Sequence, residues 1–516
     1  MQRKILWVAL ALLAALVFAG VSLAASGIRI VVDGKALDVR EARLEGGRVI
    51  VPLRPVLEAM GAEVRWDKAS KTVFITTRSV AKTSQPAAQP SGLGIDPASW
   101  AERYPAEYQT YLLNNQGGVE HSKYRGSDNF DRNSAWPFQW VLYDGWGMGK
   151  QYTESRGHTL ALVDQLEINP ARRAAGGVCL SCKTPAAPQL KEKMGVDYYR
   201  LPYDEVYKQI PQEYNKLGVS CIDCHDPQTQ ELRITRWPLT EALARMQGVP
   251  ASFTQSQKAS LACAQCHVTY SIPKDKDKKS IGLVFPWDGA RWGGITVEDI
   301  ERNIKEQGLY EWTHAVTGLR LGHIRHPEFE LFTNNSPHYR MGLSCASCHM
   351  PKVEVNGQTV SSHQWTSPFK QDLVACRSCH QEGAEALKQK VIAIQDRTNE
   401  LYTEAGFTAA QAAKAIEMAN KTLAADQQLL AQAKEAYEKA YYRVVFVGAE
   451  NSMGFHNPAE AERVLKDGLA YAREAETKAR QALEKAGVTP PAAFDLELNK
   501  YPYDPAQNRA AGHREQ

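Results

Sequence analysis

The C-terminal part of the chain shows the clearest alternation of apolar and polar positions. From Gly383 onward, alanine, leucine, glutamate, lysine and glutamine dominate, and these residues favour helices. Apolar residues recur there at the three- or four-residue spacing of a helix face, namely Leu387, Val391, Ile394 and Leu401, and further on Leu465, Leu469, Ala472, Ala475 and Ala479. The pattern predicts three long helices, over residues 384–404, 408–447 and 458–487. They form a region over 384–490, and residues 491–516 follow as a tail.

The middle helix is expected to be too long for one small domain to cover by itself. A long apolar stripe on a helix usually packs against a partner. A homodimer along this helix is therefore one expectation. An intramolecular bundle of the three helices is the other.

The N-terminus carries an apolar segment with the features of an export signal. Arg3 and Lys4 precede an apolar run over residues 5–18, and Ser22-Leu23-Ala24 has the small residues of a cleavage site. The apolar character continues to residue 25, which is also long enough to span a bilayer. Residues 1–25 are therefore predicted to be a cleaved signal peptide or a retained anchor. The chain is expected to be periplasmic or at the extracytoplasmic face of the cell membrane.

Residues 27–78 show the signals of a small α+β domain. Glycine after aspartate favours a tight hairpin turn, and glycine after a short apolar segment favours a helix end. The predicted elements are a strand over 28–32, a turn at Asp33-Gly34, a helix over 53–60 that Gly61 ends, and strands over 64–66 and 73–75.

A change of composition separates this domain from the middle of the chain. Residues 79–95 are rich in alanine, proline, glutamine and serine without apolar periodicity, which predicts a linker. Residues 96–383 are loop-rich and hold all ten cysteines. The charge is nearly balanced, with 61 basic and 58 acidic residues, so no basic field is available for nucleic acid.

All ten cysteines occur in five Cys-x-x-Cys pairs. Four pairs are followed directly by a histidine: His225, His267, His349 and His380. Disulfides and zinc sites also use paired cysteines, but covalent attachment of haem c is the chemistry that requires the following histidine. The motif predicts five haem c groups, attached at Cys179, Cys182, Cys221, Cys224, Cys263, Cys266, Cys345, Cys348, Cys376 and Cys379.

The first pair is followed by Lys183 instead of histidine. Lysine binds iron only as the neutral amine, and losing its proton at pH 7 costs roughly 4–5 kcal/mol, so burial and the iron charge must offset that cost. Four of the nine other histidines should cap the four histidine haems on their second face. The lysine haem should then keep one face open for a substrate.

These motifs together resemble ammonia-forming cytochrome c nitrite reductase, in which one lysine motif precedes four histidine motifs. The resemblance runs over about residues 96–490. It implies a mainly α multihaem cytochrome c with long C-terminal helices and a six-electron reduction of nitrite to ammonium. Residues 51–61 resemble the N-terminal domain of copper amine oxidases, but no histidine or cysteine occurs in residues 27–78. We interpret that small domain as a spacer or surface-attachment module.

The resemblance also implies roles for individual residues. On the open face, Arg156 would hold the anion, Tyr270 would offer its hydroxyl, and His326 would titrate near neutrality and donate protons. The implied second ligands are His363 for the second haem, His158 for the third, His456 for the fourth and His338 for the fifth.

The chain departs from the family pattern at positions associated with calcium. Thr269, His323 and Arg325 stand where many members have glutamate, lysine and glutamine. Oxygen ligands suited to calcium are lost there, and a cation is gained. We expect Arg325 to place its guanidinium where calcium would lie. The alternative is that Arg325 is only a surface charge.

Two other functions are compatible with parts of the pattern. A pentahaem electron-transfer cytochrome would have two histidines at every haem, which Lys183 argues against. A reductase that acts mainly on hydroxylamine or sulfite could use the same pocket. A reductase also needs an electron donor, either a membrane or soluble cytochrome or a quinol dehydrogenase.

Overall fold

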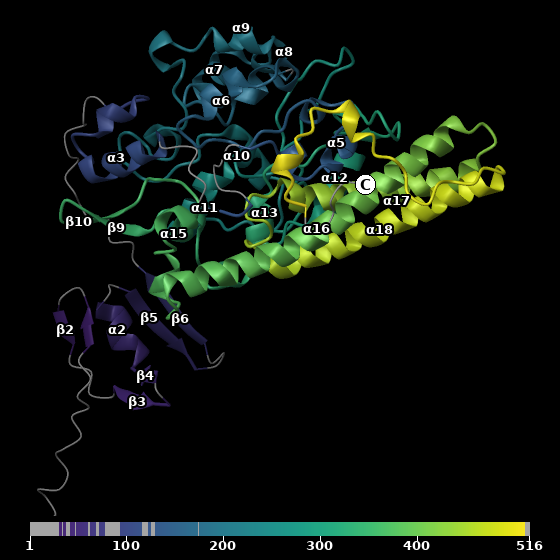
Figure 1. Cartoon of the computed structure of the whole chain (residues 1–516). Helices are drawn as coiled ribbons and strands as arrows, with labels where there is room; N and C mark the ends of the chain where they lie inside the picture. The colour runs from purple at the N-terminus through teal and green to yellow at the C-terminus, as the bar shows by residue number, and fades with distance from the viewer. Residues whose placement is uncertain are drawn as a thin grey trace, which may run out of the picture. The chain divides into compact units, whose positions relative to one another are not determined.

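The computed structural model describes residues 30–32, 35–37, 42–46, 48–59, 62–68, 72–77, 93–115, 122–124, 130–173 and 175–510. The chain divides into two compact units, Met1–Pro90 and Ser91–Gln516, and each is considered by itself (Figure 1). The predicted signal or anchor segment and most of the predicted linker lie outside the described residues.

The described residues of the first unit form three antiparallel strand pairs and one short helix, as the α+β prediction expected. The pairs are β1 (Ile30–Val32) with β2 (Lys35–Leu37), β3 (Arg43–Glu45) with β4 (Arg48–Ile50), and β5 (Ala62–Asp67) with β6 (Thr72–Thr77); the helix is α2 (Leu53–Ala59). In the last pair, Val64 lies opposite Ile75 and Trp66 opposite Val73. The turn at Asp33-Gly34 and the helix end at Gly61 lie outside the described residues.

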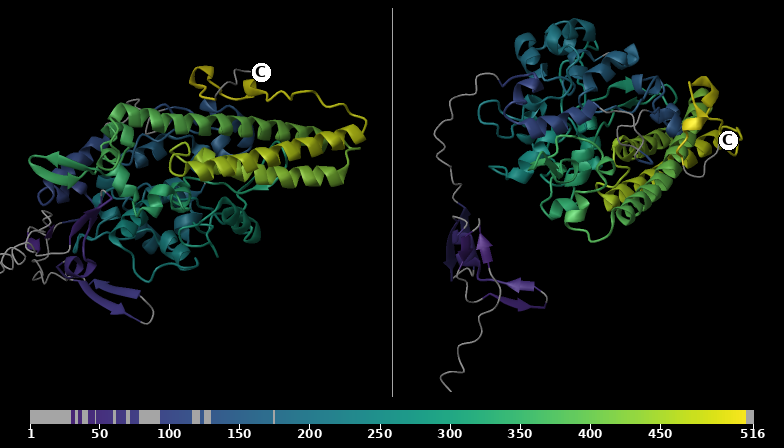
Figure 2. Two further views of the ribbon diagram at one scale, coloured as in Figure 1. Left: turned by 90° about the horizontal axis from the view of Figure 1, so that it is seen from below. Right: turned by 60° about the vertical axis from the view of Figure 1, so that its left-hand side comes forward.

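Three long helices dominate the second unit and run alongside one another (Figures 1 and 2). They are α16 (Ala384–Lys421), α17 (Gln427–Ala449) and α18 (Pro458–Lys485). The third helix agrees with its prediction. The predicted break between residues 404 and 408 is wrong, because α16 continues for 38 residues and the chain turns only at residues 422–426.

Gly406 has a packing role and does not end the helix. A Cβ atom at this position would lie 2.3 Å from the ring of Phe138, which belongs to α5 (Phe138–Leu142). Glycine is therefore needed for the close approach of α5 to α16. The actual start of α17 is set by Asp426, whose side chain accepts hydrogen bonds from the backbone of Gln428 and Leu429.

The apolar stripe of α17 is covered within the chain. Every residue of α17 from Tyr441 to Ala449 is buried, and the helix packs against α16, α18 and α12 (Val297–Glu306). This arrangement is the intramolecular bundle that the sequence left open as one alternative. Dimerisation stays a prediction that the single chain does not test.

Short helices and hairpins make up the remainder of the second unit. The helices are α3 (Pro105–Leu112), α4 (Arg132–Ala135), α6 (Ala161–Glu167), α7 (Ala187–Met194), α8 (Asp197–Arg200), α9 (Tyr203–Tyr207), α10 (Trp237–Leu243), α11 (Gln255–Ala264), α13 (Glu328–Thr333), α14 (Pro337–Arg340) and α15 (Cys345–His349). The strands are β7 (Trp312–Thr313) with β8 (Arg320–Leu321), and β9 (Lys352–Val355) with β10 (Gln358–Ser361). Within the described ranges, no helix combines the length and apolar character that a membrane span requires.

The described residues of the second unit form two hydrophobic cores. The larger one lies between the long helices, α5, α12 and α13. The smaller one packs α7, α8 and α9 against Leu180 of the first cysteine motif and against Val178, which directly precedes that motif. Tyr270 packs against both cores, so this predicted pocket residue lies at their junction.

Candidate functional site

All five cysteine motifs line one cavity of about 2010 Å³ in the second unit. None of the ten cysteines forms a disulfide, which contradicts the disulfide interpretation. Each motif is held in a helical turn; these turns are η5 (Gly176–Leu180), η7 (Cys221–Asp223), the end of α11, α15, and η9 (Cys376–Ser378). The same cavity is lined by Lys183 and by all the predicted histidine ligands and pocket residues.

The turn of the lysine motif differs from that of the histidine motifs. His225, His267 and His380 each donate their backbone N–H to the carbonyl of the first cysteine of their own motif, at 2.9 to 3.0 Å. The backbone N–H of Lys183 instead donates to the carbonyl of Leu180, at 2.9 Å, one residue nearer. The first motif is thus unusual in its backbone as well as in its last residue.

Each motif histidine lies opposite the histidine that the resemblance pairs with it. An imidazole nitrogen binds a metal ion at about 2 Å, so two rings on opposite sides of one iron have their centroids roughly 6 Å apart. The observed centroid distances are 6.2 Å for His225 and His363, 5.6 Å for His267 and His158, 6.2 Å for His349 and His456, and 6.5 Å for His380 and His338. The structure therefore brings together the four pairs that the resemblance implied. Three of them have the spacing that an iron ion between the rings requires, whereas His158 and His267 lie closer, with their Nε2 atoms 3.4 Å apart.

The Nδ1 atoms of four of these histidines lie within hydrogen-bond distance of backbone carbonyls. The acceptors are Trp365 for His158 at 3.2 Å, Gln230 for His225 at 2.9 Å, Thr366 for His349 at 2.8 Å and Ser361 for His363 at 2.9 Å. A carbonyl at Nδ1 fixes the ring orientation and leaves Nε2 for the metal. No motif marks these acceptors, so they could not be recognised from the sequence.

Two other predicted ligand histidines have buried carboxylates beside Nδ1. Glu328 Oε2 lies 3.6 Å from His267 Nδ1, and Glu450 Oε1 lies 2.5 Å from His456 Nδ1. Burial opposes the charge of Glu328, but His267 outweighs it and lowers the pKa of that carboxyl to about 2. A carboxylate at this place increases the basicity of the imidazole ligand.

Lys183 stands outside the four histidine pairs, and the predicted pocket residues lie in the same cavity. The ring of His326 is 6.4 Å from that of His267, and its backbone has a φ of +47°, a strained value for a residue with a side chain. Burial, with a further contribution from Lys183, lowers the pKa of His326 to about 3. These surroundings favour the neutral imidazole at His326, against the expectation that its pKa lies near neutrality. Burial raises the pKa of Tyr270, so its hydroxyl keeps its proton.

Arg156 has carboxylate partners that sequence reasoning missed. Its Nε donates to Asp164 Oδ1 at 2.5 Å, and its Nη2 donates to Glu167 Oε2 at 2.6 Å. Both acids belong to α6 and stand three residues apart, on one face of that helix. Two acidic residues at this spacing were the signal in the sequence that could have identified the partners of Arg156. Among the described residues, Nη1 of Arg156 makes no hydrogen bond and is left for an anion.

Arg325 is buried, which excludes the alternative of a surface charge. Its Nη1 and Nη2 donate to the two carboxylate oxygens of Glu311, at 2.8 and 2.5 Å. Nη1 also donates to the backbone carbonyl of Tyr270 at 2.9 Å, and the guanidinium lies 5.0 Å from the ring centre of Trp146. Burial opposes the charge, but Glu311 outweighs it and raises the pKa of Arg325. No motif marks Glu311, because only the fold brings it to Arg325.

His323, the other changed position of this segment, is also buried. Its ring lies 4.3 Å from that of Trp146 and 5.3 Å from that of Tyr143, measured between ring centres. Burial, with Arg325 as a further cause, lowers the pKa of His323 well below its ordinary value. The segment that carries the changed positions is therefore buried, with His323 as a neutral ring and Arg325 as a cation paired with Glu311.

Comparisons with known proteins agree with this geometry. Residues 96–516 match the family described as cytochrome c552, and residues 31–85 match the copper amine oxidase N-terminal domain. Cytochrome c nitrite reductase subunit NrfA of Nitratidesulfovibrio vulgaris is 31% identical over 420 residues, covering 75% of this chain and 79% of the relative. Cytochrome c-552 of Parabacteroides distasonis is 32% identical over 394 residues, covering 75% and 76%.

One solved structure is similar over most of the chain. It is the cytochrome c nitrite reductase of Desulfovibrio desulfuricans, described for the relevance of two calcium sites in its catalytic subunit. Its TM-score is 0.71 at 30% identity, and the match covers 80% of this chain and 91% of that one. The mainly α multihaem fold and both predicted resemblances are thereby confirmed.

Proposed function

Because the chain belongs to the cytochrome c552 family, whose members carry covalently bound haem, we propose that it reduces nitrite to ammonium at a haem bound by Lys183. Five haem c groups fit the five cysteine pairs. The observation that carries the proposal is the pairing of eight histidines into four sets, with Lys183 outside them. Four doubly ligated haems suit electron transfer, and one haem with an open face suits a substrate.

The residues around Lys183 have separate roles in this proposal. The haem supplies electrons and a site for the nitrogen of the substrate when it is bound. Arg156 holds the anion, and Asp164 and Glu167 fix the orientation of its guanidinium. Tyr270 and the neutral His326 donate hydrogen bonds to the developing oxygen charge, and His326 passes on a proton that reaches it during turnover.

We infer that Arg325 takes the place of calcium in this chain. A cation fixed by Glu311 and bonded to the carbonyl of Tyr270 supplies positive charge beside the pocket without a bound ion. The Desulfovibrio desulfuricans enzyme, by contrast, was described for its two calcium sites. The difference follows from the loss of oxygen ligands at Thr269 and Arg325.

The cellular setting is proposed from the sequence. The N-terminal segment exports the chain, so that haem attachment takes place at the extracytoplasmic side, and the domain that matches residues 31–85 acts as a spacer. Electrons come from a donor cytochrome or a quinol dehydrogenase. The active form is a homodimer.

A steady-state assay with the purified holoprotein tests the central proposal. Reduced viologen dye supplies electrons, nitrite is added, and ammonium is measured alongside dye oxidation. We expect about six electrons consumed for each ammonium formed, the stoichiometry of the reaction. Dye oxidation without ammonium would overturn the proposal, and faster turnover of hydroxylamine or sulfite would reassign the substrate. A spectrum without any high-spin haem would point to an electron carrier instead.

A further inference from the structure

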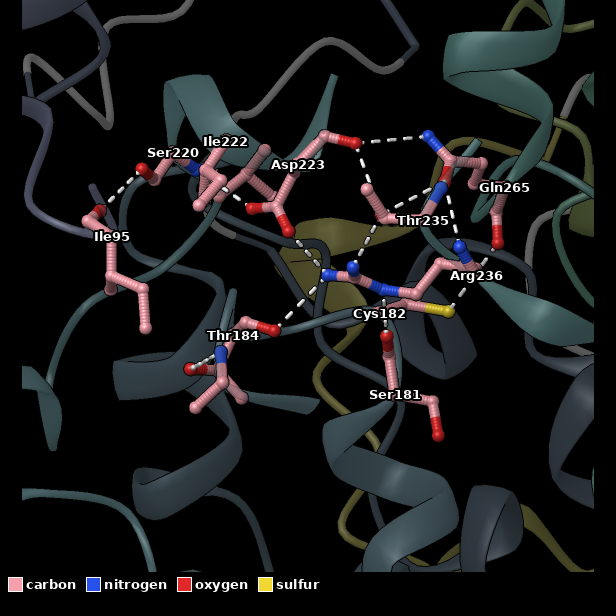
Figure 3. A network of polar contacts seen from close by, with 12 residues as sticks. Ile95, Ser181, Cys182, Thr184, Ser220, Ile222, Asp223, Thr235, Arg236 and Gln265 are labelled. Carbon is pink, nitrogen blue, oxygen red and sulfur yellow. Dashed lines mark hydrogen bonds and ion pairs between the residues drawn. The ribbon is translucent and has the colours of Figure 1, made fainter. Parts of the chain in front are cut away.

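Arg236 is a buried cation that contacts the first haem motif on both sides of Lys183. Its Nε donates to the backbone carbonyl of Ser181 at 2.5 Å, and its Nη2 donates to the backbone carbonyl of Thr184 at 3.1 Å (Figure 3). Its side chain is only 4% exposed. One planar guanidinium therefore spans the segment that carries Cys182 and Lys183.

The position of Arg236 is fixed by the second and third haem motifs. Its Nη2 donates to Asp223 Oδ1 at 2.6 Å, and the other carboxylate oxygen of Asp223 accepts the backbone N–H of Ser220 at 2.9 Å. The backbone N–H of Arg236 donates to Gln265 Oε1 at 2.9 Å, and the same oxygen accepts the backbone N–H of Thr235 (Figure 3). Asp223 and Gln265 are the residues directly before the second cysteine of their motifs. Arg236 thus connects three motifs, the first and second through its guanidinium and the third through its backbone N–H.

A lysine ligand needs this support more than a histidine ligand does. In the second and fourth motifs, His225 and His349 have backbone carbonyls at Nδ1 that orient their rings. Lysine has four rotatable side-chain bonds and no ring, so a hydrogen bond at its amine orients the side chain less firmly than a bond at Nδ1 orients an imidazole ring. The direction of a lysine ligand therefore depends more on the backbone that carries it.

We propose that Arg236 is a positioning residue that holds Lys183 in place as the iron ligand by binding the carbonyls of Ser181 and Thr184. The inference rests on the proposed ligation of iron by Lys183. It also accounts for the different turn of the first motif, in which the N–H of Lys183 bonds to Leu180. By holding these two carbonyls, Arg236 keeps the backbone on either side of Lys183 in its observed conformation.

The test compares Arg236→Lys with a matched control in the holoprotein. Lysine keeps the positive charge beside Asp223, but it lacks the planar guanidinium whose N–H groups reach the carbonyls of both Ser181 and Thr184. The control is Arg233→Lys, because Arg233 donates to one carbonyl of the second motif, that of Ile222 at 3.1 Å, and is 34% exposed. The fraction with five attached haems is selected by mass, and the electron paramagnetic resonance signal of the high-spin haem is recorded.

We expect Arg236→Lys to shift or split the high-spin signal and to lower kcat by about tenfold with little change in KM, since a misplaced ligand weakens the chemical step more than binding. The control should keep the wild-type high-spin signal. An unchanged high-spin signal in the five-haem Arg236→Lys protein would overturn the proposal. Wild-type protein that makes no ammonium would refute the proposed reaction, and the spectral comparison would still decide the role of Arg236.

A second background covers the case in which Arg236→Lys does not attach five haems. In a Lys183→His variant, the ligand ring has an Nδ1 of its own to orient it. The double variant Lys183→His with Arg236→Lys should attach all five haems, unlike Arg236→Lys alone. Its high-spin signal should match that of Lys183→His alone. A double variant that still lacks haem, or whose signal changes as much as in the lysine background, would show that Arg236 only supports the scaffold.

Discussion

The guanidinium of Arg325 forms two parallel hydrogen bonds with the carboxylate of Glu311, at 2.8 and 2.5 Å, in the protein interior. The side chains are 7% and 3% exposed. Two-point pairs of this kind combine charge with a fixed geometry. Since Arg325 also bonds to the backbone of Tyr270, the pair connects the substituted calcium position to the proposed pocket.

Replacing the carboxylate in this pair should destabilise the protein strongly. Glu311→Gln leaves Arg325 as a buried cation without a counter-charge, and breaking a buried pair costs about 3–5 kcal/mol. Denaturant unfolding of the holoprotein measures the loss. Glu462→Gln is the control, because Glu462 pairs with Lys466 on the surface and such pairs contribute about 1 kcal/mol or less. Equal effects of the two substitutions would contradict a buried, structural pair.

Chelation should leave the activity unchanged. The cation at the pocket is a side chain, so removing divalent ions with a strong chelator removes nothing that the site uses. Ammonium formation is measured before and after chelation, with and without added calcium. Loss of activity on chelation that added calcium restores would sink the idea that Arg325 replaces the ion.

The anchoring of Arg156 should matter for substrate capture. Asp164→Asn weakens the contact that Asp164 makes to both the Nε and the backbone N–H of Arg156, at 2.5 and 3.0 Å. We expect kcat/KM for nitrite to fall by about tenfold, equivalent to about 1.4 kcal/mol. Glu167→Gln should have a smaller effect, because Glu167 is 61% exposed. The reverse ranking would mean that Asp164 does not orient the guanidinium.

His326 should be required for turnover but not for assembly. Asparagine can still donate a hydrogen bond, but it cannot carry a proton, so His326→Asn should lower kcat roughly 100-fold or more. Mass analysis should still find five haems, because His326 belongs to none of the four ligand pairs. A wild-type rate in this variant would remove His326 from the mechanism.

Alanine at Gly406 should lower the thermal stability although it favours helices. The gain in helix propensity is about 1 kcal/mol, whereas forcing a methyl group against the ring of Phe138 costs about 1–3 kcal/mol. A thermal scan of the holoprotein measures the net effect. Combining Gly406→Ala with Phe138→Leu should recover part of the loss, and a double variant less stable than both single variants would contradict the steric explanation.

The long helices show how far periodicity reaches. Apolar spacing correctly indicated helices over the stretches that begin near residues 384 and 458. Burial of one helix face requires apolar residues at every third or fourth position, and this repeat is visible in the local sequence. It failed at Gly406, where the reason for glycine is a ring of Phe138 that is 268 residues away in the chain. A glycine that admits a neighbouring element cannot be told from one that ends a helix without knowing what packs there.

The sequence by itself determined the parts of this protein whose chemistry is local. Haem attachment depends on residues within one five-residue motif, so the five cysteine motifs and the exceptional Lys183 could be recognised directly. The tertiary structure decided which distant groups meet: the spacing of the four histidine pairs, the carboxylates on Arg156, the pairing of Arg325 with Glu311, and the position of Arg236. Such contacts join segments through a shared buried space, and that space exists only once the chain has folded around it.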